Sequence, residues 1–456
     1  MPGDVRGLEA WGGWFCYLPG MVKGRVISPV FALALLLGLN LLNYADRSVL
    51  SALEAKIAPD ILAPGDPFAK AKMGALMFAF LVTYMLLAPV FGLLADRWRR
   101  WWIVGLGVIG GGLASFGTGL APVFGVMFLM RALVGVSEAA YGPAAPTLIS
   151  DMFARENRGR ALSWFYLAIP VGSALGYVYG GFVGGTLGWR WAFYLLLVPA
   201  VVMGVICFFL AEPRRGQSEG AEVKPLGRSI RLADVWALLR IKSLFWNFAG
   251  ATAMTFAIGG ISFFMPRFVC TRLSPTGVFD DALLSRVNVI FGGIVVVTGL
   301  VATLGGGILA DKLRTRFSGA YLSMSGVAML LGFPMFLGVL FAPFPMAWVF
   351  VGLTVFFVFL NTGPSNAAVA NVTHPAIRST AFAVNIFVIH LLGDAISPGL
   401  IGIVADVRGK LGDTPAQALQ WGFGLVGLAM LLAGVFWLIG SRTLAADTAN
   451  ASKSLL

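Results

Sequence analysis

Twelve apolar runs, each long enough to cross a lipid bilayer, dominate the chain. Of its 456 residues, 58% are apolar and 12% are charged, whereas soluble domains carry about 25% charged residues. A helix needs about 20 mostly apolar residues to span the hydrocarbon core. The runs fall at residues 27–50, 73–95, 101–120, 123–150, 160–184, 190–211, 243–268, 287–310, 319–341, 345–370, 379–404 and 419–441. The sequence therefore predicts an all-α membrane protein with twelve transmembrane helices.

The longest polar gap separates the sixth run from the seventh and divides the chain into two halves. A motif of the first half, Gly92-Leu-Leu-Ala-Asp96-Arg97, returns in the second as Gly307-Ile-Leu-Ala-Asp311-Lys312. Two pseudo-symmetric six-helix bundles are typical of the major facilitator fold, whose substrate site lies between the halves near the midplane. The expected segments are a cytoplasmic N-terminal tail (1–26), a six-helix bundle (27–211), a cytoplasmic linker (212–242), a second six-helix bundle (243–441) and a cytoplasmic C-terminal tail (442–456).

Positive charge sets the expected orientation in the membrane. Most of the 33 Lys and Arg residues fall in the two tails and in every second loop. Because such residues accumulate on the cytoplasmic side of a membrane, we expect both termini in the cytoplasm. This placement also accounts for the net charge of +12 without nucleic acid as a partner.

Acidic and basic side chains also lie inside two of the apolar runs. Asn43, Asp46 and Arg47 are grouped within one helical turn of the first run, and Arg131 and Glu138 share one face of the fourth. A charge near the bilayer centre costs at least roughly 2.5–3.5 kcal/mol, so such groups pair, line a wet cavity or carry protons. One interpretation is structural, with salt bridges from Asp46 to Arg131 or from Glu138 to Arg47 that only fix packing. Since buried pairs add little net stability, we favour proton coupling, in which movement of an arginine changes the proton affinity of the nearby acid.

Polar residues in the second half add further candidates. His390 and Asp394 are spaced i, i+4 and form a second candidate proton site, although a single membrane-embedded His is often only hydrogen-bonded. Asn361 and Ser365 are expected to face the cavity, with helix packing as the alternative.

A glycine stripe marks the fifth run. Gly172, Gly176 and Gly180 recur every four residues, which leaves a flat surface that another helix can approach closely. The stripe is expected to serve helix packing, and a pivot for rocking is the alternative.

Charges at the ends of helices suggest a conformational latch. Asp96, Arg97 and Arg100 follow the second run, and Asp311 is the repeat of Asp96. An acid at such a position can accept hydrogen bonds from the N-terminus of a neighbouring helix. The segment resembles the major facilitator loop signature, which implies that the neighbour is the helix beginning near Ser379 and that the contact latches the outward-open state. The alternative is a solvated charge cluster that only follows the positive-inside rule.

No cofactor and no metal site are expected. The chain lacks a Gly-x-x-x-x-Gly-Lys-Ser/Thr loop, which argues against an ATP-driven pump. Its three cysteines have no metal-ligand spacing, and no nucleophile–base cluster stands out. We therefore predict that the chain is not an enzyme.

Two longer segments resemble one family of major facilitator transporters, the spinster family. They are the run from Arg131 to Phe153 with its continuation through Asn157-Arg158 and Ala168-Ile-Pro170-Val-Gly172, and the run Leu42-Asn-Tyr-Ala-Asp46-Arg47. The match covers mainly the first half, and the second half is similar only to the wider superfamily. The helix 1 pattern alone is less specific, because organic-anion symporters look similar there.

The resemblance implies a proton-coupled secondary transporter that works by alternating access and carries lysophospholipids or sphingoid-type lipids. Asp46 and Glu138 would be the proton-coupled acids. Arg47 and Arg131, with Asn43, Tyr44, Asn361 and Ser365, would bind the substrate or adjust those acids. The length and short loops fit a bacterial member, a monomer in the cell (inner) membrane.

A transporter of small organic anions or drugs is the rival reading. A sugar acid would need a second cationic site, which the second half lacks unless Arg267 or Arg286 faces inward. Both arginines are expected instead near outer helix ends, with their charged heads reaching toward water.

Overall fold

The computed structural model describes residues 28–153, 161–162, 164–213, 236, 238–274, 279–373 and 378–450. Within these ranges, twelve helical spans are long and apolar enough to cross a membrane, as the sequence predicts. A helix suits that environment because it satisfies its backbone hydrogen bonds internally. The predicted N-terminal tail and most of the linker lie outside the described residues, so the division into segments stays a prediction.

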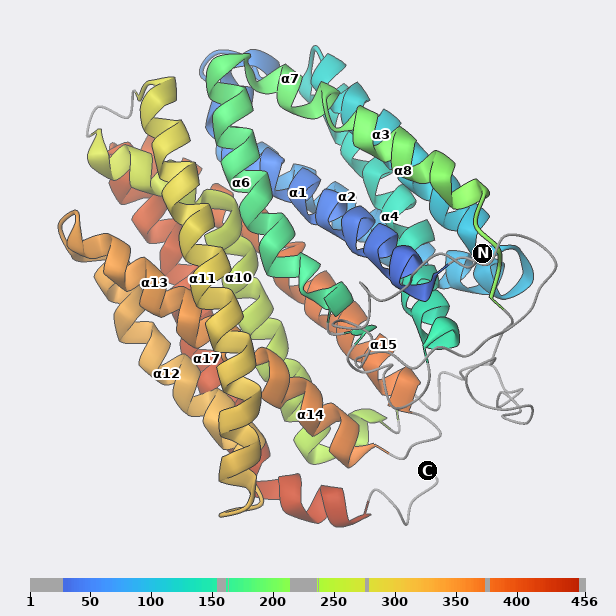
Figure 1. The fold of residues 1–456 in the computed structure, drawn as a ribbon. Coiled ribbons are helices and arrows are strands. Elements are labelled where there is room, and N and C mark those ends of the chain that lie inside the picture. Colours follow the sequence, from blue (N-terminus) through green and yellow to red (C-terminus); the bar gives the residue numbers. More distant parts are fainter. Residues whose placement is uncertain are drawn as a thin grey trace, which may run out of the picture.

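The spans of the first half pack together in one group, coloured blue to green in Figure 1. Its helices are α1 (Pro29–Ile61), α2 (Ala69–Arg97), α3 (Arg100–Leu120), α4 (Phe124–Met152), α6 (Ala168–Thr186), α7 (Trp189–Tyr194) and α8 (Leu197–Phe208). The α7 and α8 segments together make one span.

The second half, yellow to red in Figure 1, contains two spans with internal breaks. Its helices are α10 (Lys242–Leu273), α11 (Asp281–Arg314), α12 (Ala320–Phe341), α13 (Met346–Phe359), α14 (Thr362–Val372), α15 (Arg378–Ile389), the π-helical turn η3 (His390–Asp394), α16 (Ser397–Lys410) and α17 (Pro415–Asn450). The α13–α14 and α15–η3–α16 series each form one span.

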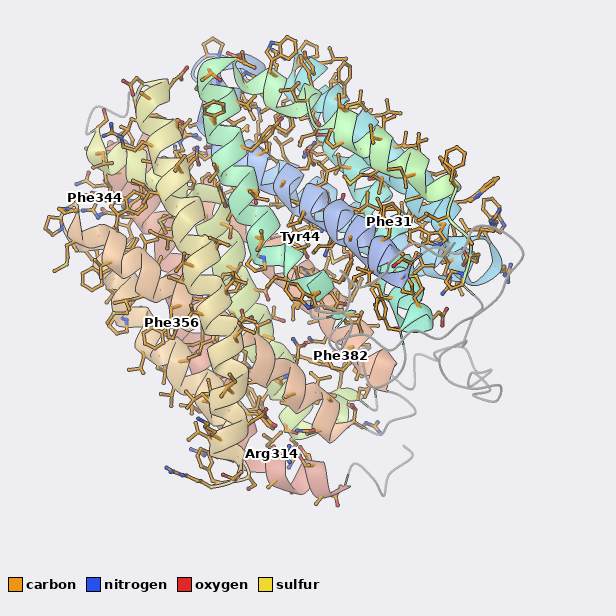
Figure 2. The ribbon with its side chains drawn as sticks, viewed as in Figure 1. Phe31, Tyr44, Arg314, Phe344, Phe356 and Phe382 are labelled. Carbon is orange, nitrogen blue, oxygen red and sulfur yellow. The ribbon has the colours of Figure 1, made fainter. Side chains whose placement is uncertain are left out.

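Because the number of spans is even, both ends of the described chain lie at the same end of the molecule. We call this the near end and the opposite end, which carries the α1–α2 and α6–α7 connections, the distal end (Figure 1). Figure 2 shows Tyr44 midway along α1 between these two ends.

The first helix differs from the prediction in length. Its apolar run stops at residue 50, yet α1 continues to Ile61. The added turns are helical because their apolar residues continue the buried face: Leu53 and Ile57 are almost fully buried. The polar residues between them, Glu54 and Lys56, interrupt the apolar pattern.

The two halves are packed together through a small set of helices. The pairs that join them include α6 with α11, α2 with α16 and α1 with α10. Val49 and Leu53 in the distal part of α1 share one buried cluster with Phe268 of α10. Leu36 and Leu39 in its near part belong to a cluster within the first half. The distal part of α1 is therefore built into the interface between the halves.

Candidate functional site

The first acid–base pair, Asp46 with Arg131, is enclosed between α1, α3 and α4. Arg131 Nη1 donates to Asp46 Oδ2 at 3.0 Å, and Ser115 Oγ donates to Asp46 Oδ1 at 2.5 Å. The Nε and Nη2 groups of Arg131 donate to Thr118 Oγ1 at 3.1 and 2.9 Å. Asp46 is 6% and Arg131 2% exposed. Both carboxylate oxygens are thus satisfied, and the pair is shielded from water.

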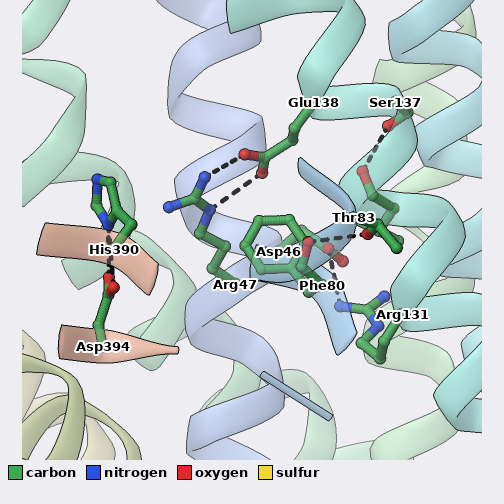
Figure 3. Close-up of polar contacts among 10 residues, drawn as sticks. Asp46, Arg47, Phe80, Thr83, Arg131, Ser137, Glu138, His390 and Asp394 are labelled. Carbon is green, nitrogen blue, oxygen red and sulfur yellow. Dashed lines mark hydrogen bonds and ion pairs between the residues drawn. The ribbon is translucent and has the colours of Figure 1, made fainter. Parts of the chain in front are cut away.

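The second pair, Arg47 with Glu138, joins α1 to α4 and is more open (Figure 3). Arg47 Nε donates to Glu138 Oε1 at 3.1 Å, and Nη2 donates to Oε2. The guanidinium also lies over three aromatic rings, 4.8 Å from the Tyr44 centroid, 4.6 Å from Phe80 and 5.9 Å from Tyr84. Its side chain keeps 16% exposure, so this cation is held in place and still partly accessible.

A close helix contact brings Phe80 to this arginine. At Gly135 of α4, an added Cβ would lie 2.1 Å from the carbonyl oxygen of Phe80. Thr83 Oγ1 also donates to the Ala132 carbonyl oxygen at 2.8 Å. Only a glycine permits so near an approach, which fixes α2 against the helix that carries Arg131 and Glu138.

His390 and Asp394 lie in the π-helical turn η3 of the second half. His390 Nδ1 is 2.9 Å from Asp394 Oδ2, and the two side chains are 27% and 19% exposed. Figure 3 shows the dyad on the side of Arg47 away from Arg131. Single π-helical turns inside α-helices occur frequently at functional sites. The structure thus places a polar dyad of the second half on the Arg47 side of the two ion pairs.

The glycine stripe of α6 faces α1. A Cβ at Gly172 would lie 2.8 Å from the Leu41 carbonyl oxygen, and one at Gly176 would lie 2.4 Å from that of Ala45. At Gly180, the nearest atom would be Ala52 Cβ at 3.1 Å. These contacts hold the segment of α1 that carries Asp46 and Arg47.

Two of the proposed substrate-binding residues are buried in this structure. Asn361 is fully buried, and its Nδ2 donates to the carbonyl oxygens of Phe357 and Val358 at 2.9 and 3.2 Å. Ser365 is also buried, and its carbonyl oxygen accepts a hydrogen bond from Asn247. Asn361 thus supplies a donor to free carbonyls at the α13–α14 break, as helix ends require. The cavity role of both residues stays a prediction. Asn43 is half-buried.

Arg100 of the predicted latch makes its contacts within the first half. Its Nη1 donates to Asp151 Oδ2 at 2.5 Å and its Nε to Glu212 Oε1 at 2.7 Å. Arg97 is exposed. Asp311 accepts a hydrogen bond from Tyr321 at 2.8 Å. The Asp96 side chain and its expected partner helix terminus lie outside the described side chains, so the latch remains a prediction.

The sequence did not predict the three ion pairs that join the halves among the described residues, and one of them involves Arg267. Arg267 Nη1 donates to Glu54 Oε1 at 2.5 Å, which corrects the expectation that Arg267 reaches outward to water. Glu54 was overlooked because it follows the apolar run. The helical spacing of Leu50, Leu53 and Ile57 around it was the signal that the helix continues. Arg286 is exposed, as expected.

Comparison with known proteins agrees with this architecture. A family model described as Major Facilitator Superfamily matches residues 14–398. The zebrafish (Danio rerio) protein spinster homolog 3 is 33% identical over 435 residues, covering 91% of this chain and 85% of that protein. The human (Homo sapiens) protein spinster homolog 1 is 35% identical over 411 residues, covering 85% and 75%.

Solved structures share the fold. A bacterial homolog of the human lysosomal transporter spinster, described as inward-facing and unoccupied, superposes with a TM-score of 0.75 at 21% identity, covering 93% of this chain and 98% of that one. A D-xylose–proton symporter gives a TM-score of 0.69 at 17% identity, covering 90% and 97%. The fold is that of the major facilitators, as the sequence predicted, and homologues of this type are transporters rather than enzymes. The chain belongs to the spinster family of major facilitator transporters.

Proposed function

We propose that this transporter is proton-coupled, works by alternating access and moves amphipathic lipids of the lysophospholipid or sphingoid type. The observation that carries the proposal is the pair of Arg47 and Glu138, which is bidentate, ringed by aromatic side chains and still partly open. The buried pair of Asp46 and Arg131 joins the same two helices, one residue away on α1 and seven residues away on α4. The proposal places the protein in the cell (inner) membrane as a monomer, with both termini cytoplasmic.

The coupling follows from charge balance in a site of low dielectric constant. While Glu138 is ionised, it occupies both the Nε and the Nη2 donors of Arg47. An anionic head group that binds Arg47 competes with that carboxylate, and a proton on Glu138 removes the competition. Proton binding and head-group binding therefore favour each other, and such linkage is reciprocal. When α1 moves relative to α4, the distance between Asp46 and Arg131 changes, and the proton affinity of Asp46 changes with it.

The first test measures flux in proteoliposomes under an imposed pH gradient. We expect Asp46→Asn and Glu138→Gln each to abolish proton-coupled transport while the folded protein elutes as the wild type does. Asp413→Asn is the matched control, since Asp413 pairs with Arg408 at the distal end and away from the site. Wild-type flux in both site variants would remove the coupling role.

The second test identifies the substrate class. The head group should bind near Arg47 and Arg131, and the tail should reach into the mostly apolar second half. Burial of a methylene gains about 0.8 kcal/mol relative to water, but much less relative to a bilayer, where the tail is already dry. We therefore expect competition assays with lysolipids to depend strongly on the head group and weakly on tail length.

The rival class, small organic anions or drugs, predicts the opposite result. Preference for a tail-free anion, without lysolipid competition, would favour it. For this rival, Arg267 is a candidate for the second cation, and it is paired with Glu54 as Arg47 is paired with Glu138.

A further inference from the structure

One carboxylate of the first half is fully buried against a cation of the second half, outside the site described above. Glu54 of α1 is 1% exposed, and its Oε1 accepts from Arg267 of α10 at 2.5 Å. Its other oxygen, Oε2, is buried and has no hydrogen-bond partner among the described residues. A carboxylate in this position depends on its single cation, because nothing else offsets the loss of hydration.

A second pair joins the halves with the polarity reversed. Asp406 of α16 is a buried acid of the second half. Its Oδ1 accepts from Lys70 Nζ at 3.0 Å, and its Oδ2 accepts from the backbone nitrogen of Ala71 at 2.9 Å. Both donors lie in the first turn of α2, where the helix dipole also favours an anion. Each half thus contributes one buried carboxylate to the other.

The backbones around these pairs touch. A Cβ at Gly74 of α2 would lie 2.5 Å from the carbonyl carbon of Pro398, and a Cβ at Gly402 of α16 would lie 2.5 Å from that of Lys70. The distal end is therefore shut between α2 and α16. A third cross-half pair, Lys56 with Asp281, is weaker, because Asp281 is 60% exposed and its charge is screened.

We propose that the Glu54–Arg267 and Asp406–Lys70 pairs are a gate that holds the distal end closed, and that Glu54–Arg267 sets how readily this end opens. The inference rests on alternating access in the proposed function and assigns the residues that control one of its two states. Glu54 follows Asp46 by eight residues on the same helix, about 12 Å along its axis. A shift of α1 at the candidate site therefore reaches the gate directly.

The exposures of the two partners predict an asymmetric response. Arg267 is 23% exposed beside Glu54, so it can recruit water when Glu54 is replaced. Without Arg267, the buried Glu54 carboxylate has no partner until the halves separate and water enters. Arg267→Gln should therefore open the distal end more than Glu54→Gln.

The experiment measures distances between spin labels at Ala63→Cys and Met346→Cys, two exposed distal positions in different halves. The labels are placed on a background in which Cys16, Cys207 and Cys270 are replaced. For Arg267→Gln, we expect the ratio of long to short distances to rise roughly tenfold or more, because an unpaired buried charge strongly disfavours the closed state. Glu54→Gln should raise it less, and the exchanged double variant Glu54→Arg, Arg267→Glu should restore the short distance.

Asp66→Asn is the matched control, because Asp66 and Lys72 form a distal ion pair within one half, at 2.5 Å. The hydrogen bond from Lys72 lowers the pKa of Asp66, so this control pair is ionised at neutral pH. Unchanged distances in both single variants, or a shift in the control as large as theirs, would overturn the gate. The measurement uses neither substrate nor a pH gradient, so its failure is distinct from a failure of proton coupling.

Discussion

At the scale of single residues, Arg131 and Arg47 differ in their access to water. Arg131 is 2% exposed and gives all its described hydrogen bonds to Asp46 and Thr118. Arg47 keeps 16% side-chain exposure beside Glu138. A charge that loses its partner costs most where water cannot replace that partner. We therefore expect the Asp46–Arg131 pair to contribute more to the stability of the fold. The Arg47–Glu138 pair is the one that can more easily exchange its partner.

This difference gives a stability prediction. Arg131→Met should destabilise the protein by about 3–5 kcal/mol, the usual cost when one partner of a buried pair is removed. Arg47→Met should cost clearly less, since hydration reaches Glu138 once the guanidinium is gone. Thermal unfolding of the detergent-solubilised variants checks the order. An equal loss of stability in the two variants would contradict the difference in water access between the two pairs.

At the scale of elements, glycine contacts set the position of α1. The α6 stripe leaves no room at Gly176, where an added Cβ would lie 2.4 Å from the Ala45 carbonyl oxygen. Backbone cannot move aside as the end of a flexible side chain can, so a larger residue must push the helices apart. Asp46 and Arg47, which follow Ala45, would move with α1.

We therefore expect Gly176→Ala to destabilise the protein by roughly 1–3 kcal/mol, as overpacking does, and to reduce transport. Gly293→Ala on α11 is the control, because nothing lies within 4 Å of its added Cβ. There the substitution should be neutral or slightly stabilising. Unfolding temperatures and flux of both variants test the pair, and a stable, active Gly176→Ala would refute the role of the stripe.

At the scale of the whole molecule, the described contacts close the distal end, and the near end is where the sequence places a latch. We expect Asp96→Asn to shift the population toward the state that is open at the near end, because the neutral amide interacts less with a helix N-terminus. Spin labels at Phe209→Cys and Phe317→Cys, both exposed and in different halves, report the distance. If it matches that of the unsubstituted protein, Asp96 is no latch.

Much of this architecture follows from the sequence alone. Twelve spans were predicted because a bilayer requires apolar runs of fixed length, and twelve are present in the described residues. Both acid–base pairings that the sequence suggested, Asp46 with Arg131 and Glu138 with Arg47, are made. Helical periodicity placed these partners on matching faces, and the cost of an unpaired membrane charge left them few other choices.

Other features were decided by tertiary packing. Asn361, which is expected to face the cavity, is buried at a helix break and donates to the freed carbonyls of Phe357 and Val358, a contact that the sequence pattern did not indicate. Glu54 and Arg267 are 213 residues apart in sequence, and no local pattern specifies their contact. The sequence determined by itself which segments enter the bilayer and which charges must find partners there, since both depend on local hydrophobicity and on the energy of an unpaired charge. Only the tertiary structure decided which half supplies the partner and which end is shut, because those depend on how two separately patterned bundles meet.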